Sequence, residues 1–168
     1  MIMRASIIWL IFLPYFCQAQ QKGVVNIKDL ETICQMDSTS FSDYVQPLDF
    51  KLGQNRIANG CTFYGFLSKE SEATGVYNKV SLLRCSEGNM SMFMSTNRDY
   101  FVKLKKAFIA DGFVFKGKST GSPEYSNYSK GSHKLRFYSK IELGIVSYTI
   151  QYWIEKNSTP FEPIYDLN

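Results

Sequence analysis

Apolar and polar residues alternate along most of the chain between residues 51 and 154, and turn signals interrupt the alternation at short intervals. The clearest segment is residues 145–154 (IVSYTIQYWI). Its even-numbered residues are Val146, Tyr148, Ile150, Tyr152 and Ile154, and they alternate with Ser147, Thr149, Gln151 and Trp153. Such a segment is typical of a strand with one buried and one wet face. The pattern therefore predicts an antiparallel sheet covered on one side.

Dipeptides that favour tight turns divide this region into hairpins. Residues 51–58 and 61–67 flank Asn59 and Gly60, which form the strongest two-residue hairpin signal. Further hairpins are expected over 78–85 with 90–95, over 124–130 with 133–140, and between the last of these strands and 145–154. In the last hairpin we expect Lys140 opposite Ile145. Phe137 and Leu135 then lie opposite Tyr148 and Ile150, which joins the apolar faces of both strands.

Three segments have helical rather than alternating patterns. Residues 26–36 place apolar side chains on one face of a short helix. Ser40 and Asp43 fit a capping box for a second helix, which Pro47 must end. Thr96 and Asp99 repeat that box before a third helix, which is expected to stop at Gly112.

The chain also contains an approximate internal repeat. Residues 48–52 (LDFKL) resemble 111–115 (DGFVF), and 79–82 (KVSL) resemble 134–137 (KLRF). We predict an α+β fold of two layers, an antiparallel sheet with helices on one face, formed by duplication of an α-β-β-β-β unit. The pseudo-repeats cover about 38–95 and 96–156 of one domain, 20–156, which a tail (157–168) follows. Chance similarity between unrelated segments is the alternative interpretation.

The first nineteen residues have the layout of a secretory signal peptide. A basic start with Arg4 precedes a run of twelve largely apolar residues, 5–16, and Ala19 occupies the −1 position of a cleavage site. A run of twelve residues is too short to cross a bilayer as a helix, which takes about 20 apolar residues. We expect cleavage after Ala19 and a secreted or periplasmic product without a membrane span. An uncleaved anchor or a buried core helix is the alternative. The oligomeric state stays open.

Charge and cysteine content limit the possible partners and bonds. The chain has 19 basic and 15 acidic residues, and the basic residues are scattered instead of following one face, so no nucleic-acid partner is expected. Cys34, Cys61 and Cys85 remain after the leader is removed. If a disulfide forms, Cys61–Cys85 is favoured, because both residues lie in predicted strands of one sheet. The alternative is that all three are buried as small apolar residues.

The Ala19-Gln20-Gln21 end of the leader, the doubled arrangement of helices and hairpins, and the high content of Tyr, Phe, Lys and Ser carry a resemblance. In these features the chain resembles the small exported hypothetical proteins of Bacteroidetes-type bacteria. The resemblance covers most of the mature chain, and it implies export but no activity and no catalytic residue.

Few residue patterns point to catalysis. His133 is the one histidine, and it lies beside a predicted turn. Glu70 and Glu72 lie in a polar loop, without the apolar surroundings that raise the pKa of a catalytic acid. The cysteines are far apart, so neither a metal site nor a cofactor is expected. A small hydrolase that uses His133 or an acidic pair is the alternative function.

The predicted outer face of the final hairpin carries the candidate binding residues. Aromatic side chains set among hydrogen-bonding groups are typical of protein interfaces and sugar platforms. We expect a non-catalytic recognition module for a protein or glycan; a structural component of an envelope assembly is a further alternative. The alternative is an ordinary solvent-exposed sheet face, which would show the same composition. Met90, Met92 and Met94, which share one face of a predicted strand, are expected in the core. The candidates are Arg136, Tyr138, Lys140, Gln151 and Trp153.

Overall fold

The computed structural model describes residues 22–58, 60–68, 75–120 and 122–155. The expected leader with its cleavage site at Ala19, the tail, and Glu70 and Glu72 lie outside these ranges. The helices are α1 (Ile27–Ile33), α2 (Ser38–Val45) and α4 (Arg98–Ala110). The strands are β1 (Phe50–Ala58), β2 (Cys61–Ser68), β3 (Asn78–Arg84), β4 (Asn89–Ser95), β5 (Val114–Lys118), β6 (Tyr125–Lys130), β7 (His133–Glu142) and β8 (Ile145–Ile154).

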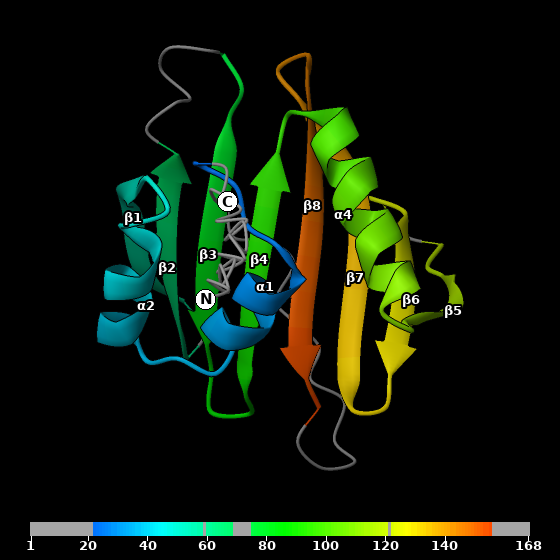
Figure 1. The fold of residues 1–168 in the computed structure, drawn as a ribbon, viewed down its shortest axis with the longest axis horizontal. Coiled ribbons are helices and arrows are strands. Elements are labelled where there is room, and N and C mark those ends of the chain that lie inside the picture. Colours follow the sequence, from blue (N-terminus) through cyan, green and yellow to red (C-terminus); the bar gives the residue numbers. More distant parts are fainter. Residues whose placement is uncertain (1–21, 59, 69–74, 121, 156–168) are drawn as a thin grey trace, which may run out of the picture.

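The eight strands form one antiparallel sheet in the order β1-β2-β3-β4-β8-β7-β6-β5. The predicted α+β class with an antiparallel sheet is therefore confirmed. Figure 1 shows the helices in front of the sheet, with α1 over β4 and α4 beside β8. We call the side that faces away from these helices the open face.

Side-chain caps start each helix, at positions slightly different from those predicted. Asn26 and Asp29 form a capping box around the first turn of α1. Asp37, not Ser40, caps α2 by accepting a hydrogen bond from the Ser40 N–H, and Asn97, not Thr96, caps α4. The side chains of Asp and Asn accept hydrogen bonds from the free N–H groups of a first helical turn as well as a hydroxyl does. Asp37 and Asn97 therefore act as the caps instead of the nearby Ser40 and Thr96.

The register of the last hairpin differs from the prediction by two residues. Glu142, not Lys140, lies opposite Ile145, and Phe137 pairs with Ile150 instead of Tyr148. The turn is made by Leu143 and Gly144, whose φ angles of 51° and 79° suit a tight hairpin turn. A slip of two residues keeps each side chain on its face, so the predicted buried set is unchanged.

The main core lies between the sheet and the helices. Central strands contribute side chains such as Val80, Phe93 and Ile150, and α4 contributes Leu104 and Phe108. Each such side chain contributes roughly 1.5–3 kcal/mol when it is fully buried. Where β4 passes under α1, the Ser91 hydroxyl donates a 2.7 Å hydrogen bond to the Leu30 carbonyl.

A second, smaller apolar cluster lies on the open face, where it buries Met90 as expected but also buries Trp153, which was expected to be exposed. Trp153 points to this face as predicted, yet it is only 7% exposed because it packs with Phe63, Leu83 and Met90. Met90 is fully buried in the same cluster, whereas Met92 is half-buried against it. The three aligned methionines therefore lie on the side of the sheet opposite the main core, because Ser91, Phe93 and Ser95 lie on the helix-covered side of β4.

Candidate functional site

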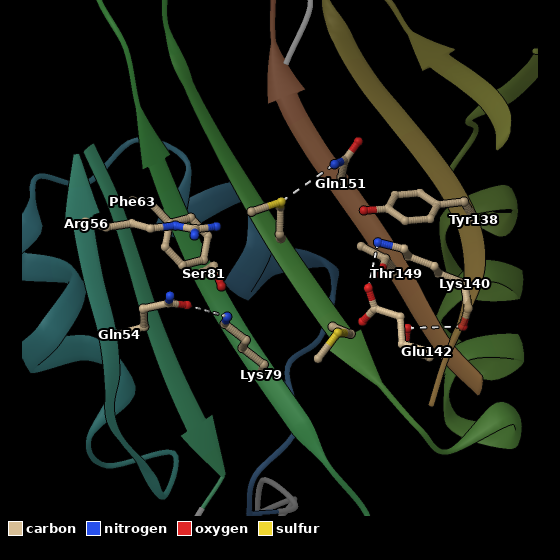
Figure 2. Close-up of a pocket in the computed structure, with 13 residues that line it drawn as sticks. Gln54, Arg56, Phe63, Lys79, Ser81, Tyr138, Lys140, Glu142, Thr149 and Gln151 are labelled. Atoms are coloured by element: carbon tan, nitrogen blue, oxygen red, sulfur yellow. Dashed lines mark hydrogen bonds and ion pairs between the residues drawn. The ribbon is translucent and has the colours of Figure 1, made fainter. Parts of the chain in front are cut away.

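A hollow of about 200 Å³ lies on the open face, above β4 and between the two outer parts of the sheet. Figure 2 shows side chains from β1 and β3 along one side and side chains from β7 and β8 along the other. Three cationic side chains and one carboxylate are among the residues around it. The lining residues are Gln54, Arg56, Phe63, Lys79, Ser81, Met92, Met94, Tyr138, Lys140, Glu142, Ser147, Thr149 and Gln151.

A β-bulge in β1 directs two of these side chains into the hollow. Leu52 pairs with Phe66, but the register then shifts, so that Gln54 pairs with Gly65 and Arg56 with Phe63. Paired residues share a face, and a bulge changes which face the following residues occupy. Without the shift, Gln54 and Arg56 would lie on the same face as Leu52 and Phe66, which is the side of the sheet that carries the helices.

The first wall of the hollow is a pair of cations over an aromatic ring. Lys79 Nζ lies 4.8 Å and Arg56 Cζ lies 5.7 Å from the centre of the Phe63 ring. Gly65 makes this packing possible, because a Cβ there would lie 2.8 Å from Lys79 Cε and 3.0 Å from Phe63 Cε1. Gln54 Oε1 accepts a 3.3 Å hydrogen bond from Lys79 Nζ. We call Arg56 and Lys79 the cation pair.

The electrostatics of the cation pair favour an anion. Burial, and secondarily the charge of Arg56, hold the pKa of Lys79 below its usual value. Within the described part of the chain, no carboxylate forms a salt bridge with either member of the pair. Two like charges that share one side of a half-buried hollow repel each other, and a bound negative group would relieve that repulsion.

The second wall carries Tyr138, Lys140 and Glu142. Lys140 Nζ and Glu142 Oε1 form a salt bridge of 2.6 Å, so the charge of Lys140 is largely compensated. Burial raises the pKa of Tyr138, while a hydrogen bond with Thr149 opposes that rise. Tyr138 therefore keeps its proton at neutral pH and can act as a hydrogen-bond donor or acceptor.

A buried amide forms the floor between the walls. Gln151 is only 2% exposed, and its Nε2 lies 3.6 Å from the Met92 sulfur. Its Oε1 has no hydrogen-bond partner among the described residues. A buried acceptor in this state costs free energy that a donor would recover. In Figure 2 the amide lies between the labelled side chains of the two walls.

The structure brings three of the five predicted binding residues to the hollow and leaves two beside it. Tyr138, Lys140 and Gln151 line it, whereas Arg136 and Trp153 do not. The Arg136 guanidinium carbon lies 4.2 Å from the Tyr125 ring centre and 5.4 Å from that of Trp153. Arg136 thus lies over the Trp153 ring, which cannot serve as an open stacking platform.

Sequence reasoning missed the cation pair and Gln54. They belong to the first half of the chain, and nothing in the linear pattern places that half beside the final hairpin. Lys79 alternates with the buried Val80, which marks it as an open-face residue of β3. Arg56 has no comparable signal, because the bulge in β1 breaks the alternation before it.

His133 contacts a hydroxyl group at the other end of the sheet. Its Nδ1 and the Tyr152 hydroxyl form a hydrogen bond. Tyr152 is completely buried, and this burial raises its pKa, so its hydroxyl stays protonated.

A second hollow of about 270 Å³ lies near the end of β8 and is lined by Cys34, Gln35, Asn89 and Ile154. Cys34 Sγ there donates a 3.2 Å hydrogen bond to the Asn89 carbonyl.

Comparison of the chain with protein-family models, with curated proteins and with solved structures finds no match. Within the described ranges, no three His, Cys, Asp or Glu side chains are grouped as a metal site would require. The helices of this same part of the chain are too short or too polar to cross a membrane.

Proposed function

We propose that this protein is an exported, non-catalytic recognition module that binds a protein or glycan through the open face of its sheet. The observation that carries the proposal is the hollow itself. It combines a cation pair without a carboxylate partner among the described residues and a buried amide oxygen without a donor. A hollow on which a few polar groups converge is typical of ligand sites.

The disulfide supports the export part of the proposal. Cys61 and Cys85 are joined in the structure, which is the pair favoured from the sequence. Stable disulfides are common in proteins of oxidising compartments and rare in the cytosol. The bond therefore agrees with the leader-like pattern of residues 1–19, from which it is an independent observation.

We infer that the domain has two layers and arose by duplication of an α-β-β-β-β unit. α2 precedes the meander β1-β2-β3-β4, α4 precedes the meander β5-β6-β7-β8, and β4 pairs with β8. Both first strands carry a register shift at the same step, Leu52 to Gln54 and Phe115 to Gly117. Both also follow a residue with positive φ, at Asp49 and Gly112.

The strand pairings support the same relation between the halves. Val80 pairs with Phe93, and the corresponding Leu135 pairs with Tyr152. The junction pairs Phe93 with Ile150 and Ser91 with Tyr152, so a pseudo-twofold axis would pass through the Met92–Gln151 pair. The proposed site thus lies where the two halves meet, a common position for ligand sites in proteins built from two units.

The rival functions have less support. A hydrolase would use the contact between His133 and Tyr152, but a buried, protonated phenol is a poor nucleophile or base. An assembly component would expose a long edge strand that is ready to pair. Both edge strands, β1 and β5, carry a bulge and basic residues, which hinder edge-to-edge association.

Charge reversal on each side of the sheet tests the proposal. Arg56→Glu/Lys79→Glu changes the open face, and Lys103→Glu/Lys106→Glu makes the same charge change on exposed positions of α4. The readout is binding to an array of glycans and to protein from envelope extract. We expect the open-face variant alone to lose binding. Equal binding by both variants would contradict the proposal, and ligand hydrolysis that His133→Ala abolishes would favour the hydrolase.

A further inference from the structure

We propose that the hollow binds an acidic sugar residue of a glycan chain, with its carboxylate at the cation pair and a hydroxyl at Gln151. This inference rests on the proposed function and specifies its ligand. It requires that one ligand supply two kinds of group: a negative charge on the β1–β3 side and a hydrogen-bond donor on the floor. Each requirement follows from a different observation.

The first requirement comes from Arg56 and Lys79. Both cations lie against the Phe63 ring, and Arg56 Nε is buried without a hydrogen-bond acceptor among the described residues. A carboxylate can accept hydrogen bonds from a guanidinium and an ammonium at once, and charge-assisted bonds of this kind are the stronger ones. The opposite wall offers less attraction, because Glu142 already compensates Lys140.

The second requirement comes from the floor. Gln151 Oε1 accepts no hydrogen bond from the described residues, and a carboxylate cannot provide one because it has no proton to donate. An acidic sugar has hydroxyl donors on the same ring as its carboxylate. A glutamate or aspartate side chain has none, so an acidic peptide would have to bring a main-chain N–H down to the floor.

The size of the hollow fits one sugar ring. Its volume of about 200 Å³ is below the roughly 300–1,000 Å³ of sites that enclose a drug-sized molecule. Tyr138 on the second wall and Met92 on the floor are both half-buried, and they offer apolar contact to the ring carbons. The rest of the glycan would run along the open face, where Thr149 and Ser147 continue the polar lining.

Three probes separate the chemical classes when calorimetry measures their binding to the full chain. Hexagalacturonate carries carboxylates and hydroxyls, its methyl ester keeps the hydroxyls without the charge, and hexaglutamate keeps the charge without the hydroxyls. We expect hexagalacturonate to bind at least about tenfold more tightly than either other probe. Its affinity should also fall when the salt concentration rises from 25 to 500 mM.

Variants assign the two requirements to their residues. Arg56→Gln/Lys79→Gln should lower the affinity for the acid to that for the ester. Gln151→Leu should weaken the binding of the acid and of the ester about tenfold. The melting temperature of this variant should stay the same or rise, because a buried acceptor without a donor is removed. The control is Gln46→Leu, which makes the same change at the exposed residue that caps the C-terminal end of α2. A Gln151→Leu protein that is strongly destabilised would indicate a structural role and contradict the assignment.

The outcomes distinguish this inference from the proposed function. Equal binding of acid and ester would overturn the acidic class but leave recognition of glycans by the open face. Tighter binding of hexaglutamate would overturn the glycan class in favour of an acidic protein segment. If none of the probes binds, the inference fails, and the charge-reversal assay decides the proposed function by itself.

Discussion

At the scale of single residues, the direction of a side chain and its burial are separate properties on the open face. Trp153 shares this face with Gln151 and Thr149, yet Arg136 lies over it and Phe63, Leu83 and Met90 pack beside it. Alternation along a strand predicts direction alone. Burial on a face without helices depends on which neighbouring strands supply large side chains, and the sequence of one hairpin does not contain that information.

This burial changes the result expected for Trp153→Ala. From direction alone, the substitution would leave folding nearly intact. From the packing, we expect it to lower the free energy of unfolding by about 3–5 kcal/mol, as large-to-small changes in cores do. Phe115→Ala, at a half-exposed ring on the edge strand β5, is the control and should cost about 1 kcal/mol. Chemical denaturation measures both, and a near-neutral Trp153→Ala would contradict the packing.

At the scale of elements, the disulfide closes one end of the β2–β3 hairpin. Cys61 begins β2, Cys85 follows β3, and the two are 24 residues apart in the sequence. Both residues belong to or contact the small cluster around Trp153. The bond therefore joins the strands that carry Phe63 and Lys79, and so supports one wall of the hollow.

Removal of this disulfide should lower stability without abolishing the fold. For a closed loop of this length, the unfolded chain gains conformational freedom equivalent to roughly 3 kcal/mol when the bond is absent. We expect Cys61→Ala/Cys85→Ala to lose about that much free energy of unfolding and to keep its far-ultraviolet dichroism. Reduction of the wild-type protein should give a similar loss. A protein whose stability does not change on reduction would contradict a formed Cys61–Cys85 bond.

Local signals predicted most elements, since hairpin turns, caps and alternation act between residues close in sequence. Even the register error in the last hairpin was harmless, because a two-residue slip kept Phe137 and Ile150 on the buried face. The helix starts moved by one to three residues because several neighbouring residues can cap equally well, as Asp37 does in place of Ser40.

At the scale of the whole molecule, the candidate site depends on a contact that no local pattern reveals. β4 and β8 are far apart in the sequence, and their pairing brings Met92 beside Gln151 and sets the two halves next to each other. That pairing places Lys79 across from Tyr138 on one surface. The sequence could therefore supply Tyr138, Lys140 and Gln151 as candidates, but not the cation pair that completes the hollow.

The central claim is that a ligand binds at the junction of the two halves, on the open face. The most direct test is to follow the backbone amide signals of the labelled protein by NMR during titration with hexagalacturonate. The account predicts that the largest shifts fall on β3, β4 and β8, centred on Lys79, Met92 and Gln151. Shifts centred instead on α1, α4 or the hollow beside Cys34 would contradict it.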